Sequence, residues 1–165
     1  MPNPFSTFSS LSAQSGSVEV KAALTERAKI MQLCDASGQA VITPAACGNL
    51  PHALRCAIAI RIAHANGCKE LAAIYAPLLP TLNATQDVAA IADGATAADA
   101  RGAAILSYVD TVTLTPAKAS RTHIAALLAT GLTDSDVVSL AELVACINFQ
   151  ARVLAGVRLV EETFA

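Results

Sequence analysis

Residues 52–65 constrain the fold more than any other segment, because they have helical spacing and almost no polar surface. This segment has four polar residues, two histidines and two arginines, and its other ten residues are Ala, Ile, Leu or Cys. A helix that is apolar on nearly every side has to be enclosed by other elements. Strand signals are confined to VEV at 18–20 and VTLT at 112–115, and neither run has a partner run. The sequence therefore predicts an all-α domain of about six to eight helices.

Helical periodicity extends over most of the remaining chain. Apart from an Ala-rich stretch with few boundary signals, the other predicted helices span residues 17–36, 68–79, 97–112, 117–130 and 133–162. We expect Ser37-Gly38 to end the first of these helices, and Thr115-Pro116 to open the one that begins at residue 117. Thr133 and Asp136 resemble a capping box at the start of the last helix.

Residues 1–16 are rich in Ser, Pro and Asn, and we expect them to form a flexible N-terminal arm. Residues 17–165 then form a single domain. Phe5, Phe8 and Leu11 are the isolated apolar residues of the arm. They are candidates for packing along a neighbouring subunit, and a frayed tail is the alternative.

The composition indicates self-association. Apolar residues make up 54 % of the chain, charged residues make up 15 %, and the mean hydropathy is +0.51. A monomer of 165 residues has difficulty hiding so much apolar surface, so we expect a homo-oligomer. The net charge of −2 and the pI near 5.8 offer no electrostatic reason to bind nucleic acid or an anionic membrane.

The sequence has no signal for a membrane span, for secretion, or for a cofactor or metal site. No unbroken run of roughly 18–20 apolar residues is present to span a bilayer, and the N-terminus has no basic and apolar regions of a secretory signal. The five cysteines are odd in number and contain no CxxC pair, which predicts a reduced, cytoplasmic protein. No phosphate loop and no metal-ligand spacing is present, so we expect no cofactor and no metal.

Cys68 is the one plausible nucleophile. It follows the Asn66-Gly67 break and stands at the first turn of the predicted helix 68–79. Unpaired N–H groups and the positive end of the helix dipole stabilise a thiolate at that position. We therefore expect the pKa of the Cys68 thiol to be lowered.

Polar residues on apolar helices need partners. For Arg55 and Arg61 the candidate partners are Glu70 and Glu142. The last helix also carries polar residues that indicate an internal network or an interface, with an anion-binding pocket as the alternative: Asn148, Gln150 and Arg152.

Two stretches carry a resemblance to a known family. The first is the helix, Asn-Gly-Cys turn and helix of residues 52–75. The second is residues 99–159, with TLTPAKAS, LLATGLTDSDVV and the series Phe149, Gln150 and Arg152. In these motifs the chain resembles the alkylhydroperoxidase D-like, carboxymuconolactone decarboxylase superfamily, in particular its branch of CMD-domain, peroxidase-related proteins. The resemblance implies an alkylhydroperoxidase D-like helical domain that assembles as a trimer or hexamer.

The same resemblance implies a degenerate peroxidase site. Active family members reduce hydroperoxides with a CxxC pair, a glutamate twelve residues before the first cysteine and a histidine four residues after the second. When Cys68 is taken as the first cysteine, Leu71 stands at the second cysteine position. Cys56 stands at the glutamate position and Tyr75 at the histidine position. Since Leu71 cannot attack a peroxide, the family's usual mechanism cannot operate.

Three functions remain open. The leading hypothesis is a family member that binds a small organic ligand in an apolar pocket around Cys56, Cys68, Leu71 and Tyr75, with Tyr75 donating a hydrogen bond. The second is an antioxidant, peroxiredoxin-like oxidoreductase that reduces a hydroperoxide through Cys68 alone or with Cys56. The third is a non-redox enzyme acting on a small lactone or acid.

The catalytic candidates are therefore Cys68, Cys56 and Tyr75, and each has a structural alternative. Either cysteine can be a small buried residue of the core, and Tyr75 can be a core tyrosine whose hydroxyl reaches water. Glu70 and His64 are further candidates for the pocket. A surface or subunit-contact position is the alternative for His64.

Overall fold

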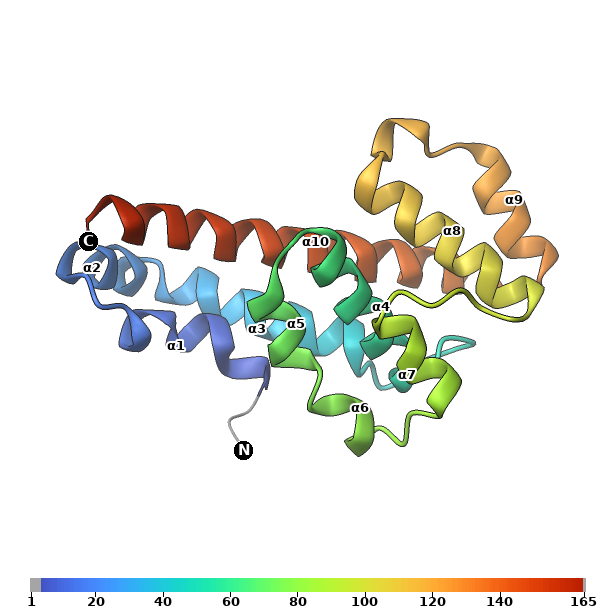
Figure 1. The fold of residues 1–165 in the computed structure, drawn as a ribbon, viewed down its shortest axis with the longest axis horizontal. Helices are drawn as coiled ribbons and strands as arrows, with labels where there is room; N and C mark the ends of the chain where they lie inside the picture. Colours follow the sequence, from blue (N-terminus) through green and yellow to red (C-terminus); the bar gives the residue numbers. More distant parts are fainter. Residues whose placement is uncertain (1–3, 165) are drawn as a thin grey trace.

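A computed structural model describes residues 4–164, and every regular element among them is helical (Figure 1). The all-α prediction is therefore confirmed. Two short 3₁₀ helices span Pro4–Ser6 and Pro116–Lys118. The α-helices are α1 (Thr7–Gln14), α2 (Val18–Glu26), α3 (Ala28–Ile42), α4 (His52–Ala65), α5 (Lys69–Tyr75), α6 (Leu78–Thr81), α7 (Gln86–Ala92), α8 (Ala100–Leu114), α9 (Arg121–Ala129) and α10 (Asp134–Thr163).

Helix α4 lies at the centre of the domain, as its composition predicts. It contacts α3, α5, α6, α7, α8 and α10, and residues 55–60 are all buried. Ile58 and Ile62 are buried on one side of the helix, and Ile60, two positions from each, is buried on the opposite side. Because neighbours cover α4 on nearly every side, the helix tolerates the near absence of polar residues.

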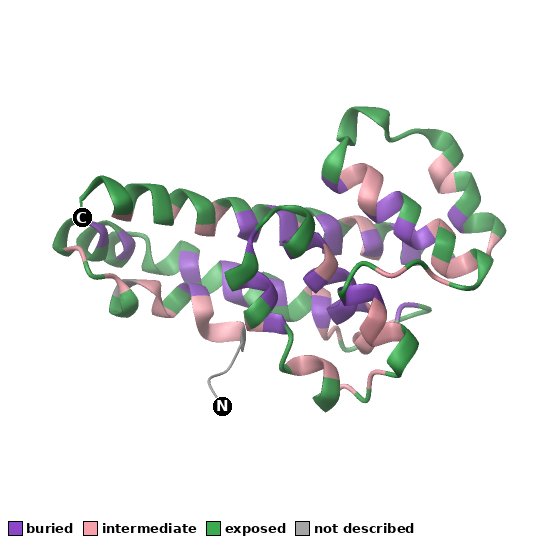
Figure 2. Ribbon diagram, in the orientation of Figure 1, coloured by how far each residue is buried: buried purple, intermediate pink, exposed green. Residues whose placement is uncertain are grey.

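Helix α10 is the longest element and runs along the domain in the opposite direction to α3 (Figure 1). Residues 136–151 contain its buried positions, whereas most of residues 152–164 are exposed (Figure 2). By length and composition alone α10 could cross a membrane, although half of its most apolar window is buried inside the domain. Core helices of water-soluble proteins share these properties, so this is weak evidence for a membrane span.

The expected helix over residues 17–36 is two helices, and the predicted stop at Ser37-Gly38 is wrong. The chain breaks at Arg27 between α2 and α3, and α3 continues through Gly38 to Ile42. A Cβ added at Gly38 would lie 2.6 Å from Nε2 of Gln150 and 3.0 Å from the hydroxyl oxygen of Tyr75. Gly38 therefore lets other helices approach α3 closely and does not end it.

Residues 7–14 form helix α1, where the sequence suggested an arm without regular structure. Phe8 is only 2 % exposed, and it packs into the core of its own chain. The carboxylate of Asp35 on α3 accepts hydrogen bonds from the backbone N–H groups of Phe8 and Ser9, at 2.9 and 2.8 Å. A residue 27 positions away thus caps α1, and no local pattern could reveal it.

The two predicted helix starts near the C-terminus have different outcomes. Thr133 and Asp136 form the expected capping box of α10. Pro116 opens only a 3₁₀ turn, and α9 begins at Arg121. There Ser120 and His123 cap the helix reciprocally, because the His123 ring accepts a hydrogen bond from the backbone N–H of Ser120.

Asp136 also joins distant parts of the chain. Its carboxylate accepts hydrogen bonds from the backbone and side-chain nitrogens of Asn49, both at 2.8 Å, as well as from Thr133. These bonds, led by that of the Asn49 side chain, hold the pKa of Asp136 well below its usual range. The carboxylate therefore ties the segment before α4 to the first turn of α10.

We predict that Asp136→Asn lowers the free energy of unfolding by about 1–3 kcal/mol at pH 7, since the partly buried hydrogen bonds from Asn49 and Thr133 lose a charged acceptor. The folded-state pKa of Asp136 is lower than the unfolded-state value, so its stabilisation is fully present above about pH 4 and disappears as the pH falls further. Urea unfolding of both proteins should therefore show a smaller difference at pH 3 than at pH 7.

The exposed Asp134→Asn is the matched control, because Asp134 lies in the same helical turn and makes no contact with Asn49. Its effect should stay below about 1 kcal/mol. An equal loss of stability in both variants would show that helix charge, and not the contact with Asn49, matters at this site.

Candidate functional site

Cys68 is the N-cap residue of α5, but its thiol is buried, with only 3 % of the residue exposed. The sulfur lies 3.8 Å from Oε2 of Glu70. Burial is the largest influence on the thiol and raises its pKa, while a hydrogen bond from the backbone of Leu71 acts in the opposite direction. The expected lowering of this pKa is therefore wrong, because α5 is a short helix and removal from water outweighs its N-terminal groups.

Cys56 lies in the core without any exposed surface, and its thiol donates a hydrogen bond to the backbone carbonyl of Tyr75 at 3.5 Å. Burial raises the pKa of this thiol to about 12. Cys56 and Cys68 are both free thiols in the structure. Each sulfur has its own hydrogen-bond acceptor, and no disulfide links them.

Tyr75 is sealed in the core and does not reach water. Its hydroxyl donates a hydrogen bond to Oε1 of Gln150 at 2.6 Å, and the amide nitrogen of Gln150 donates to the carbonyl of Cys34 at 3.2 Å. Burial raises the pKa of the tyrosine. These bonds link α3, α5 and α10, and they occupy the hydroxyl that the ligand hypothesis requires.

The remaining residues of the predicted pocket separate in the structure. Leu71 is fully buried beside Cys56 and Tyr75 in the core cluster. Glu70 is exposed and forms an ion pair with Arg158 on α10 at 3.1 Å. His64 is exposed, and its Nδ1 lies 3.1 Å from the carbonyl oxygen of Ala92. The predicted pocket is therefore not present as a pocket. Four of its residues are buried in the core, and Glu70 and His64 are exposed at the surface.

The two arginines of α4 have other partners than Glu70 and Glu142. Arg61 forms two hydrogen bonds of 2.8 Å with the carboxylate of Asp110 on α8. Arg55 is 1 % exposed and forms no ion pair with a carboxylate of residues 4–164, although the charges of Asp136 and Glu142 act to raise its pKa. Its guanidinium donates instead to the Ser139 hydroxyl and to three backbone carbonyls, those of Val41, Cys47 and Leu50.

The polar residues of α10 divide between the interior and the surface. Asn148 accepts a hydrogen bond from the Asn66 side chain at 3.0 Å and donates to the Thr113 hydroxyl at 3.3 Å. Gln150 bonds to Tyr75 as described above, whereas Arg152 is exposed. The predicted internal network therefore exists for Asn148 and Gln150 but does not include Arg152.

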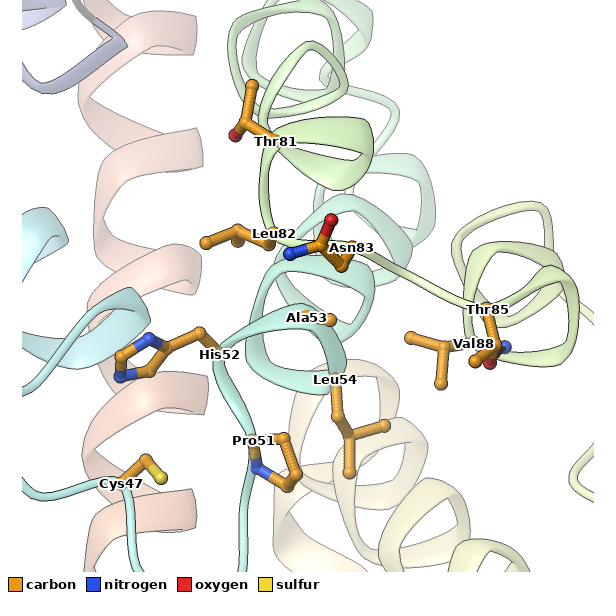
Figure 3. A pocket seen from close by; sticks show the side chains of 10 residues that line it. All are labelled: Cys47, Pro51, His52, Ala53, Leu54, Thr81, Leu82, Asn83, Thr85 and Val88. Atoms are coloured by element: carbon orange, nitrogen blue, oxygen red, sulfur yellow. Dashed lines mark hydrogen bonds between the residues drawn. The ribbon is translucent and has the colours of Figure 1, made fainter.

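An open cavity of about 600 Å³ lies between the start of α4 and the connection from α6 to α7. Figure 3 shows Cys47 and His52 on one side of the view, and Thr85 and Val88 on the other. The cavity is lined by Cys47, Pro51, His52, Ala53, Leu54, Thr81, Leu82, Asn83, Thr85 and Val88. Its walls are mostly apolar, and none of these residues carries a carboxylate, an ammonium or a guanidinium group.

The lining carries polar side chains at His52, Thr81, Asn83 and Thr85, but the hydroxyls of Thr81 and Thr85 bond to the backbone of Leu78 and Val88. Nε2 of His52 lies 2.8 Å from the carbonyl oxygen of Pro44 and donates a hydrogen bond to it. Asn83 has a φ of 55°, in the left-handed region that asparagine tolerates better than most residues. The arrangement suits a neutral organic molecule with one or two polar groups.

Sequence reasoning did not identify this cavity. Pro77 and Pro80 indicated a loop close to one side of the cavity, and Pro51 indicated a helix start on the other side. Nothing in the local pattern indicated that residues 47–54 and 81–88 face each other. Tertiary packing of α4 against α6 and α7 brings the two segments together.

Within residues 4–164, no group of three or more His, Cys, Asp or Glu side chains is arranged to hold a metal ion. A scan against protein-family models gives no match, and neither does a search among curated proteins.

We predict that iodoacetamide at pH 8 labels Cys47 first in the native protein, because Cys47 is half-buried and lies at the cavity. Cys56 and Cys68 should react at least about ten-fold more slowly, since burial raises the pKa of both thiols and hinders access. Mass spectrometry of digested samples gives the rate for each site. Unfolding in urea should remove the difference.

Cys68→Ser is the control for the assignment, and it should leave the fast reaction of Cys47 unchanged. Rapid native labelling of Cys68 would contradict the buried geometry and would favour the thiol peroxidase hypothesis.

Proposed function

We propose that this protein is an alkylhydroperoxidase D-like, carboxymuconolactone decarboxylase-type protein that has lost peroxidase chemistry and binds a small neutral organic molecule. The cavity beside the start of α4 is the proposed binding site. The observation that carries the proposal is this cavity, which combines apolar walls with the His52 and Asn83 side chains. Its volume of about 600 Å³ lies within the range of ligand pockets.

The geometry of the thiols supports the loss of peroxidase chemistry. A peroxide-reducing cysteine needs a lowered pKa and access to its substrate, whereas Cys68 is buried with a raised pKa. Cys56 is more deeply buried, and its thiol contacts the backbone of Tyr75. These two cysteines and Leu71 pack as apolar residues of the core and do not form a reactive centre.

The cavity lining supports a particular class of ligand. Apolar walls favour a molecule with a hydrocarbon body, and the absence of charged lining residues disfavours an ionised one. Nδ1 of His52 can accept a hydrogen bond, and the Asn83 amide can donate one or accept one. A medium-chain alcohol, ketone or lactone has this chemistry. The lining lacks the carboxylate that would pair with His52 in acid and base catalysis, which supports binding over turnover.

The proposal includes a cytoplasmic location and a homo-oligomeric assembly. Five free thiols are compatible with a reducing compartment, where disulfides are rare. Large apolar side chains that remain exposed in the single chain, such as Phe149, Leu159 and Phe164, are compatible with subunit contacts.

A thermal-shift screen with neutral medium-chain alcohols, ketones and lactones tests the proposal. A compound present at 100 times its dissociation constant should stabilise the protein by about 2.7 kcal/mol. Ala53→Leu fills the cavity from α4 and should abolish the shift, whereas Ala125→Leu on the exposed face of α9 should preserve it. The absence of any shift for the wild-type protein across the panel would overturn the proposal.

The same samples test the peroxidase alternative. Cumene hydroperoxide with dithiothreitol should be consumed no faster with the protein than with Cys68→Ser. Consumption that requires Cys68 would establish the thiol peroxidase function in place of the binding function.

A further inference from the structure

Helix α10 carries an outer face that stays exposed in the described part of the chain. Val138 and Phe149 on this face are 59 % and 48 % exposed, although both are large and apolar. Spacings of three and four residues place six exposed side chains on one side of the helix. We define the outer face by these residues: Val138, Glu142, Ala145, Phe149, Arg152 and Gly156.

The order of residues on the outer face is complementary to itself when a second helix runs in the opposite direction. Ala145 and Phe149 are each two positions from residue 147, so the small side chain of one copy meets the aromatic ring of the other. Glu142 and Arg152 are each five positions from residue 147, so opposite charges meet. Val138 and Gly156 are each nine positions away, and again a larger residue meets a smaller one.

The charges on this face are available for such a contact, although the charge of Glu142 also acts to raise the pKa of Arg55 in its own chain. Glu142 and Arg152 are both exposed, and neither forms a hydrogen bond or an ion pair with any residue between 4 and 164. They cannot pair with each other inside one copy, because ten residues of helix separate them by about 15 Å. Across a two-fold axis near residue 147, each charge would meet one opposite charge of the other copy, so that the pair forms twice.

Gly156 is a second, independent indication of close approach. Glycine in the interior of a helix costs about 1 kcal/mol relative to alanine. A Cβ added at Gly156 would meet no other atom of the chain within 4 Å, so packing inside the chain does not require glycine there. At Gly38, by contrast, the chain itself fills that space. At Gly156, the space left by the missing side chain would let a helix of another molecule approach the outer face closely.

We propose that a second copy of this chain binds the outer face, so that two α10 helices pack antiparallel about a two-fold axis near Ala145 and Phe149. Each Glu142 then pairs with Arg152 of the partner subunit. A two-fold contact of this kind forms a dimer by itself and is also one of the contacts that a hexamer with dihedral symmetry uses. The charge order and Gly156 favour this occupant over an unrelated apolar partner.

Charge exchange tests the proposal by sedimentation velocity over a range of protein concentrations. Glu142→Arg and Arg152→Glu, each alone, place like charges together and should weaken association at least about ten-fold. The double variant Glu142→Arg, Arg152→Glu restores opposite pairs across the axis and should recover the wild-type mass. Glu162→Arg is the matched control on another side of α10 and should leave the mass unchanged.

Each of three results would overturn the proposal: a monomeric wild-type protein, single variants that retain the wild-type mass, or a double variant that fails to recover it. Circular dichroism and thermal unfolding of each variant identify any change in mass that arises from misfolding. None of the residues that line the ligand cavity belongs to α10, so failure of this interface would leave the binding proposal unaffected.

Discussion

The buried guanidinium of Arg55 is the interaction on which the arrangement around α4 depends. It takes a positive charge into the core without a carboxylate, and it compensates with hydrogen bonds to the backbone carbonyls of Val41, Cys47 and Leu50 and to the Ser139 hydroxyl. Loss of water lowers the pKa of Arg55, but each of its three guanidinium nitrogens donates at least one hydrogen bond. One side chain thereby holds the end of α3, the following loop and the first turns of α10 against α4.

The cavity beside the start of α4 depends on this anchoring. Arg55 fixes the carbonyls of Cys47 and Leu50, and Asp136 fixes Asn49 between them. Cys47 and Pro51 are therefore held in place on the side of the cavity that faces the α6–α7 connection. A loop held only by its own turns would close or fray, whereas a loop held by buried polar bonds keeps a cavity open.

The positions around Cys68 belong to the core. Where the family resemblance would require catalytic groups, Leu71, Tyr75 and Cys56 are all buried, and the Cys56 thiol donates a hydrogen bond to the backbone carbonyl of Tyr75. The Tyr75 hydroxyl is then satisfied by Gln150, which can approach because Gly38 has no side chain. The polar group that a proton relay would expose to substrate is used instead to join three helices.

Much of the fold was predictable because its signals are local. The enclosed helix α4, the capping box of Thr133 and Asp136 and the all-α class follow from residue periodicity and from neighbours within one helical turn. Other features depend on residues far apart in the chain. Asp35 caps α1 across 27 positions, and Asp136 binds Asn49 across 87.

Apart from α1 and the break at Arg27, the sequence by itself determined most of the helical segments and which of them must be covered, because apolar periodicity and end-capping act over a few residues. Only the tertiary structure decided the state of Cys68 and the place of the cavity. A helix N-terminus favours a thiolate in water, but the covering residues remove the water, and burial then dominates its pKa. Segments 47–54 and 81–88 likewise become one cavity only because α4 packs against α6 and α7.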